Sequence, residues 1–246
     1  MGGGLYMANM LYRTNIIGMV GGGTNPKYPP NKLIIWDDIE NTIVGELTFG
    51  PRIRTFALRR DIIAIAFEEQ VMIFSLSDLE LLKTHETGPN TFNVLSLNTK
   101  TRDPIVAMMG IERGQIKIYF IKTDKEVTIE CHQGDIRAIA LNPEGTLVAT
   151  ASTKGTLIRI FSTSQAAPVR ELRRGSEKAD IQSISFSSLS IYLACTSDKG
   201  TAHIFSIWAD EQESEDFEPS IIENTDEELT QRRHSFVTRN DKGLQK

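Results

Sequence analysis

The chain has 246 residues, of which 40% are hydrophobic, and a formal net charge of −5. This length and apolar content support one large domain or two small ones with a buried core. The negative charge argues against a general nucleic-acid or membrane-surface binder, so any anion site must be local. No apolar run approaches the roughly 20 residues that span a bilayer. Cys131 and Cys195 lie far apart, which favours a reduced, soluble, cytosolic protein without a disulfide framework.

A short apolar strand that ends in an aromatic residue recurs five times along the chain. The aromatic residues stand at positions 36, 74, 119, 161 and 205, so the steps between them are 38, 45, 42 and 44 residues. A period of about 40–45 residues with about four strands in each unit is typical of a β-propeller blade. The five strands are Leu33–Trp36, Val71–Phe74, Ile116–Tyr119, Ile158–Phe161 and Ala202–Phe205.

Further strands are predicted around these five, because their residues alternate between apolar and polar or small side chains. The opening strand of the first unit is predicted at Met10–Tyr12, and the later opening strands at Ile53–Leu58, Phe92–Leu97, Ile136–Leu141 and Ile181–Phe186. Second strands are predicted at Ile16–Val20, Ile62–Phe67, Ile105–Met109, Leu147–Ala151 and Tyr192–Thr196. No helical periodicity appears before residue 209, so the fold class is all-β.

The repeats predict a partial WD40-like β-propeller at residues 8–208, with about four full blades and part of a fifth. The first unit has little sequence for its opening strand, and the repeat stops after Trp208. Residues 209–228 then contain ten acidic residues and no lysine or arginine. Such a segment repels itself and lacks the apolar surface needed to fold alone. We therefore expect residues 209–246 to form an acidic, disordered tail.

Catalytic and metal-binding motifs are not recognisable in the chain. Gly21–Gly23 lacks the Gly-Lys-Ser/Thr spacing of a phosphate-binding loop and is better explained as a loop between the second and third strands of its unit. The four histidines are dispersed, and no serine stands in a nucleophile motif. The sequence predicts a protein that is not an enzyme and needs no metal or cofactor.

An adjacent pair of arginines, Arg173 and Arg174, lies between two copies of a Lys-Gly-Thr strand pattern. Neighbouring strand residues point to opposite faces, so each arginine is expected to face a different repeat. Hydroxyl donors and a forked guanidinium suit a phosphate, and the flanking repeats carry hydroxyls at matching places. The alternative is that the arginines are solvated or pair with Glu171 and Glu177. The hydroxyl residues are Ser152, Thr153 and Thr156 on one side and Thr196, Ser197 and Thr201 on the other.

These features resemble the PROPPIN family, the seven-bladed propellers of autophagy that bind polyphosphoinositides. The resemblance runs over roughly residues 14–208 and includes the family's Phe/Leu-Arg-Arg-Gly hallmark, here Leu172–Gly175. The other matching motifs are Val20–Gly23, Lys27–Lys32, Ile35–Asp38, Ala149–Ser152 and Lys154–Phe161.

The resemblance implies two sites for the head groups of phosphatidylinositol 3-phosphate and 3,5-bisphosphate. The first would use Arg173, His132, Ser152 and Thr156, and the second Arg174, Ser197, Thr201 and His203. Gly175 would let the strand end turn without a side chain in the way of the lipid. A lone strand histidine is otherwise more often simply packed.

The same resemblance implies an effector of autophagosome formation that binds no nucleic acid. It would be cytosolic and recruited to the phagophore assembly site and to endosomal or vacuolar membranes. Its expected partners are phosphoinositide membranes and autophagy proteins, either lipid-transfer or conjugation factors. The chain departs from the family in its blade count. An alternative is therefore a protein-interaction scaffold that has lost lipid binding through truncation.

Overall fold

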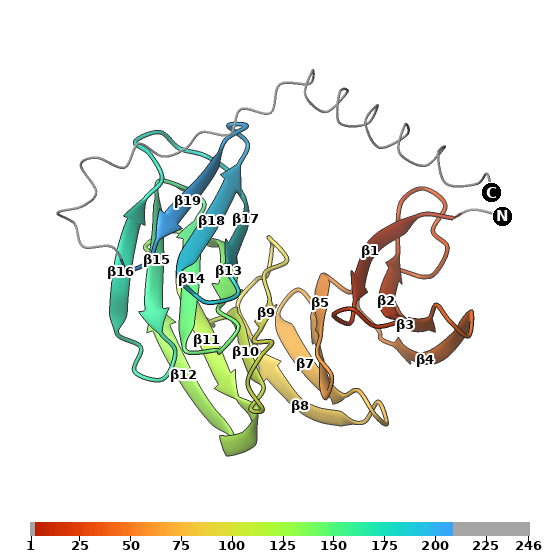
Figure 1. Cartoon of the computed structure of the whole chain (residues 1–246). Helices are drawn as coiled ribbons and strands as arrows, with labels where there is room; N and C mark the ends of the chain where they lie inside the picture. The colour runs from red at the N-terminus through yellow and green to blue at the C-terminus, as the bar shows by residue number, and fades with distance from the viewer. Residues whose placement is uncertain (1–2, 209–246) are drawn as a thin grey trace, which may run out of the picture.

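The computed structural model describes residues 3–208, where nineteen strands form five antiparallel sheets that follow one another around an arc (Figure 1). We number these sheets as blades 1 to 5 along the chain. Within this range the one helical element is a short 3-10 turn, η1 (Ile121–Thr123), and no helix has the length and apolarity to cross a membrane. The predicted acidic tail, residues 209–246, lies outside the described residues.

Each blade is a meander in which consecutive strands pair, and the first strands of neighbouring blades contact each other along the inner side of the arc. Blade 1 contains β1 (Leu5–Met10), β2 (Ile16–Gly21), β3 (Lys32–Asp37) and β4 (Thr42–Thr48). Blade 2 contains β5 (Thr55–Leu58), β6 (Ile62–Ala66), β7 (Gln70–Ser75) and β8 (Leu81–Glu86).

The remaining blades follow the same plan until the described chain ends. Blade 3 contains β9 (Ser96–Leu97), β10 (Ile105–Met109), β11 (Gln115–Phe120) and β12 (Lys125–Glu130). Blade 4 contains β13 (Ile136–Leu141), β14 (Leu147–Ser152), β15 (Leu157–Ser162) and β16 (Pro168–Arg173), and blade 5 contains β17 (Ile181–Phe186), β18 (Tyr192–Ser197) and β19 (Ala202–Ser206). The prediction of an all-β propeller with about four full blades and part of a fifth is confirmed.

The opening strand of blade 1 differs from the prediction. It is β1 (Leu5–Met10), so only Met10 of the predicted Met10–Tyr12 belongs to a strand, and the chain then enters a turn in which Tyr12 has a φ of 52°. Five of the six residues of β1 are exposed, so the strand lacks the apolar alternation that marks a half-buried strand. Its place is set by pairing with β2 and by a hydrogen bond from Asn9 Nδ2 to the Phe56 carbonyl oxygen of blade 2, at 3.1 Å. Blade 1 is therefore complete.

The opening strand of blade 3 is also shorter than predicted. Only Ser96–Leu97 of the expected Phe92–Leu97 pairs as a strand. The buried Asn90 side chain bonds both the amide and the carbonyl of Val94, at 2.8 and 2.9 Å, which removes that residue from the ladder. A side chain that satisfies the backbone locally competes with sheet pairing in this way.

The segment after β2 is a loop, as predicted for the triple glycine. Residues 22–31 connect β2 to β3, and the chain doubles back closely on itself there. A Cβ at Gly21 would lie 1.6 Å from the carbonyl oxygen of Tyr28, so only glycine fits. Gly21, the last residue of β2, therefore allows the close approach of the loop, whereas Gly23 has open space and a φ of 84°.

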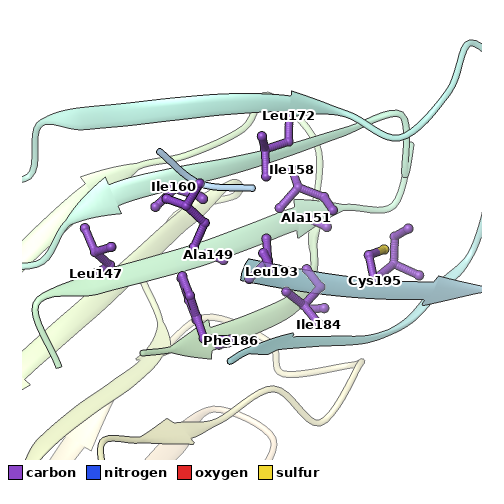
Figure 2. Close-up of a cluster of buried hydrophobic side chains, with 14 residues drawn as sticks. Leu147, Ala149, Ala151, Ile158, Ile160, Leu172, Ile184, Phe186, Leu193 and Cys195 are labelled. Carbon is purple, nitrogen blue, oxygen red and sulfur yellow. The ribbon is translucent and has the colours of Figure 1, made fainter. Parts of the chain in front are cut away.

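The apolar cores lie between neighbouring blades, because alternate strand residues point to opposite faces of each sheet. Between blades 4 and 5, side chains from β14, β15 and β16 pack against β17 and β18 (Figure 2). The opposite face of blade 4 packs against blade 3 through residues such as Val148 and Phe161. Each core between two blades is therefore formed by one face of each blade. The Arg-Arg motif lies at the edge of such a core, at the end of β16.

Candidate functional site

The motif Leu172–Gly175 lies at the end of β16, the outer strand of blade 4. Leu172 pairs with Ile158 and joins the core between blades 4 and 5 (Figure 2). Arg173 pairs with Leu157 and Glu171 pairs with Arg159, so Arg173, Glu171 and Arg159 share the other face. That face looks toward blade 3, because Arg159 Nη1 donates to the carbonyl oxygen of Cys131 at 2.7 Å. Arg173 therefore lies on the blade 3 side.

Arg174 follows the strand and is held by backbone acceptors. Its amide donates to the Thr156 carbonyl oxygen at 2.9 Å, and its Nε donates to the Gly155 carbonyl oxygen at 2.7 Å. Nη2 donates to the carbonyl oxygen of Glu177. These bonds anchor the guanidinium at the turn that leads into β15, which leaves Nη1 without a bond to residues 3–208.

The carboxylates named as alternative partners of the arginines are used differently. Glu171 pairs with Arg159, at 2.8 Å between Oε2 and Nε, and Glu177 contacts Arg174 only through its backbone oxygen. Neither Arg173 nor Arg174 forms an ion pair with any of residues 3–208. Two adjacent guanidiniums without carboxylate partners leave positive charge available to an anion.

The first predicted group lies where blades 3 and 4 meet. His132 follows β12, and its Nε2 lies 3.0 Å from Thr150 Oγ1 on β14. Ser152 is two residues further along β14, on the same face as Thr150, and both serine and threonine are buried. Burial, together with the positive charge of Arg159, lowers the pKa of His132 to about 4. The imidazole is therefore neutral at pH 7.

Thr156 contacts the second arginine of the motif. It is buried, with 7% of its surface exposed, and its carbonyl oxygen receives the amides of Arg174 and Gly175. Its backbone thus touches the second arginine of the motif, although the resemblance assigns its side chain to the first site. No hydrogen bond joins the side chains of Arg173, His132, Ser152 and Thr156 to one another within the described range.

The second predicted group lies where blades 4 and 5 meet. His203 on β19 pairs with Cys195 of β18, whose side chain belongs to the core facing blade 4. Directly opposed residues share a face, so His203 also looks toward blade 4. Thr201 Oγ1 lies 3.2 Å from His203 Nε2. Burial, and then the positive charge of Arg174, lower the pKa of His203.

The two groups are built on equivalent turns. Ser152 Oγ accepts the amide of Lys154, and Ser197 Oγ accepts the amide of Lys199, each at 3.4 Å. A glycine with positive φ follows each lysine, at 66° for Gly155 and 75° for Gly200. The repeat therefore places a buried serine at the same corner of two successive blades.

Arg159 is a residue that the sequence analysis missed. It pairs with Thr150, two residues before Ser152, whereas His203 pairs with Cys195, two residues before Ser197. Arg159 and His203 thus occupy equivalent positions in their blades. An alignment of the Lys-Gly-Thr motifs would instead offset the two residues by one position. When the two units are aligned on their terminal aromatic residues, Phe161 and Phe205, Arg159 and His203 fall at the same position. That alignment could have identified Arg159 from the sequence.

Gly175 has a simpler setting than expected. Its φ is not in the positive range, and a Cβ there would meet no protein atom within 4 Å. The turn at the strand end therefore does not require glycine. The structure leaves open space where a side chain at this position would begin.

The comparisons with known proteins agree with this architecture. The PROPPIN family profile matches residues 4–225. SVP1-like protein 2 of Neurospora crassa is 38% identical over 207 residues, covering 84% of this chain and 47% of the relative. Autophagy-related protein 18e of Arabidopsis thaliana is 33% identical over 208 residues, covering 84% of this chain and 56% of the relative.

A solved structure shows the same arrangement. The complex of KlAtg21 with the coiled-coil of AgAtg16 contains a chain that superposes with a TM-score of 0.71 at 27% identity, covering 82% of this chain and 66% of that one. The present chain spans about half the length of the curated relatives it matches. The family profile, the relatives and the shared fold show that the chain belongs to the PROPPIN family.

Proposed function

We propose that this chain is a non-enzymatic phosphoinositide effector of autophagosome formation. Its ligands would be phosphatidylinositol 3-phosphate and 3,5-bisphosphate. The observation that carries the proposal is the pair of adjacent arginines at the end of β16, Arg173 and Arg174, which have no carboxylate partner within residues 3–208. Phosphate suits such forked donors, because it accepts several charge-assisted hydrogen bonds at once.

Each arginine would act with the donors of one neighbouring blade. Arg173 would bind one head group with His132, Ser152 and Thr156, and Arg174 would bind another with Ser197, Thr201 and His203. The repeated Ser-x-Lys-Gly turn supports this division, because it offers a similar corner on each side of the motif.

Membership of the PROPPIN family and the relative named as an autophagy-related protein support the cellular role. We propose that the protein is recruited from the cytosol to the phagophore assembly site and to endosomal or vacuolar membranes. The KlAtg21 structure contains the coiled-coil of AgAtg16. By analogy we propose that an autophagy protein docks on the loops of these blades.

Liposome flotation with the full chain tests the lipid assignment. We expect flotation with vesicles that contain phosphatidylinositol 3-phosphate or 3,5-bisphosphate, and none with vesicles of phosphatidylcholine and unphosphorylated phosphatidylinositol. The variants are Arg173→Ala, Arg174→Ala and the double change. Arg170→Ala removes the same charge from the same strand and is the matched control, since its residue lies three positions before Arg173. Equal flotation by the double variant and the control would refute the site.

A second candidate is a protein-interaction scaffold without lipid binding. The observation in its favour is that the chain spans only 47% of the Neurospora relative, so surfaces of the longer protein are not all present. This candidate predicts that the chain captures a partner in a pull-down and that the double arginine variant captures it equally well. Selective flotation that depends on Arg173 or Arg174 would exclude it.

A further inference from the structure

A positively charged cleft lies away from the Arg-Arg motif, between the loops that join the first and second strands of blades 1, 2 and 3. Its volume is about 770 Å³. The lining comes from residues 12–14, 59–61 and 99–102 and includes five cationic side chains but one carboxylate, Asp61. The cations are Arg13, Arg59, Arg60, Lys100 and Arg102. The lipid assignment does not use this cleft.

Arg59 builds the cleft by joining two of its loops. The residue is 5% exposed, its Nε donates to Asp61 Oδ1 at 2.8 Å, and its Nη1 donates to the Asn98 side chain at 2.9 Å. Nη2 donates to the carbonyl oxygen of Thr101. A buried guanidinium with its donors satisfied by two loops holds both in a defined arrangement. Arg59 is therefore structural, and the neighbouring cations are presented by a fixed support.

The third loop is tied to the others by Tyr12. Its hydroxyl donates to the Thr99 carbonyl oxygen at 3.3 Å, and the guanidinium carbon of Arg60 lies 5.4 Å from the centre of its ring. Arg13, Arg60 and Arg102 are exposed, and none of them forms an ion pair with any of residues 3–208. Asp61 is already paired with Arg59. The cleft thus carries positive charge that the described part of the chain does not neutralise.

The described chain ends next to this cleft. Trp208 Nε1 donates to the carbonyl oxygen of Ser190 at 3.0 Å, in the loop between β17 and β18. Lys100, a cation of the cleft, donates to the carbonyl oxygen of Ser188 in the same loop. One short loop therefore separates the end of the described chain from the cleft. The sequence continues with residues 209–228, which contain ten carboxylates and no lysine or arginine.

We propose that the acidic segment 209–228 of the same chain binds in this cleft. An extended chain advances about 3.3 Å for each residue, so a few residues reach Lys100 and the rest can cross the cleft. The segment lacks the apolar surface for a core, and binding through charge needs none. Tethering raises the local concentration of the segment, so that several weak ion pairs suffice. The occupant of the cleft is thus a segment of the same chain, and the proposal does not depend on the lipid proposal.

Carbodiimide cross-linking of the full chain tests the proposal, because the reagent joins a carboxylate to an amine that lies in contact with it. Lys100 is the amine in the lining of the cleft. We expect mass spectrometry to find Lys100 joined to an acid of residues 210–228. The Lys100–Glu144 pair, 3.5 Å apart, gives a reference cross-link that shows Lys100 to be reactive. An equal mixture of ¹⁴N and ¹⁵N chains distinguishes links within one chain from links between two.

The cleft variant is Arg13→Gln with Arg102→Gln, which removes two of the exposed cations. We expect its tail cross-link to fall about fivefold relative to the reference, as two weakened surface ion pairs would give. The matched control is Lys125→Gln with Arg170→Gln, which makes the same charge change on the outer strands β12 and β16 and should leave the yield unchanged.

Three results would overturn the proposal. The first is a reference cross-link with no tail cross-link, and the second is an equal yield from the cleft variant and its control. The third is a tail cross-link found only in mixed-isotope pairs, which would mean that the segment binds a second copy.

Discussion

The Nε atom of Arg174 donates to the carbonyl oxygen of Gly155 at 2.7 Å, so the second arginine of the motif closes the turn that leads into β15. Arg173, one residue earlier, forms no side-chain bond to residues 3–208. The two neighbours therefore differ in what they contribute to the fold. This difference decides how their variants should be interpreted.

We predict that Arg174→Ala lowers the free energy of unfolding by about 1–2 kcal/mol, because it removes charge-assisted bonds to two carbonyl oxygens. Arg173→Ala should change it by less than about 0.5 kcal/mol, as is usual at an exposed position. Urea unfolding followed by circular dichroism measures both. Arg173→Ala is then the cleaner variant for lipid binding. Equal losses for the two variants would contradict the bonding described for Arg174.

Three glycine variants separate steric from conformational effects. Gly155→Ala should be severely destabilising, by more than about 2 kcal/mol, since the φ is 66° and a Cβ would lie 1.9 Å from the Ala179 carbonyl oxygen. Gly200→Ala has a similar φ but open space, so we expect about 1 kcal/mol. Gly175→Ala should be nearly neutral. Thermal unfolding gives the order, and a loss at Gly175 as large as that at Gly155 would show that the turn geometry is wrong.

We predict that Arg159→Gln raises the pKa of His132 from about 4. Burial is the larger cause of the low value, and the positive charge of Arg159 is the second. Removing that charge while keeping a polar side chain leaves burial as the cause that lowers the pKa, opposed by Thr150 and by the negative charge of Glu171. Titration of the imidazole by NMR measures the change. Arg170→Gln serves as the control, and a pKa that stays the same in both variants would remove Arg159 from this site.

The stability of the chain should fall as the pH is lowered from about 6.5 to 4. The pKa of His132 is about 4 in the folded chain and about 6.5 when unfolded, so the unfolded state binds more protons in this window. The stabilisation is complete above pH 6.5 and is lost as the pH falls toward 4. We expect a loss on the order of 1–2 kcal/mol, reduced from the full shift because the ring is partly exposed.

The variant His132→Gln should flatten this dependence, and urea midpoints at several pH values measure it. Some slope will remain, because burial also lowers the pKa of His85 and of His203. An unchanged slope in the variant would show that His132 does not titrate with folding.

A soluble head group should raise the pKa of His132, if the first site binds phosphate as proposed. A phosphate dianion beside the imidazole favours its protonated form. We expect inositol 1,3-bisphosphate to shift the NMR titration of His132 upward, and Arg173→Ala to abolish the shift. The same ligand should leave the pKa of His85 unchanged, since that ring lies on β8 and bonds Glu126. A shift of both rings would indicate a nonspecific effect of the anion.

Local pattern was enough to identify most of the fold. The strands at Ile136–Leu141 and Ile181–Phe186 have the predicted bounds, and most of their apolar residues are buried in the cores between blades. The recurrence of these patterns at a blade-sized period predicted the propeller. Adjacent arginines on an extended strand were expected on opposite faces. Arg173 ends β16 and lies on the blade 3 side, whereas Arg174 follows the strand and its opposite placement stays a prediction.

Tertiary contacts decided the rest. The residues of strand β1 are mostly exposed, and the strand is held in place by its pairing with β2. Strand β9 is short because the side chain of Asn90 bonds the backbone of Val94. Arg159 is identified as part of the candidate site because it lies opposite Thr150, and that position depends on how β14 and β15 pair. The cationic cleft joins residues nearly 90 positions apart through loops of three blades. Composition and periodicity describe neighbours along the chain, whereas a binding surface is formed by residues that only packing brings together.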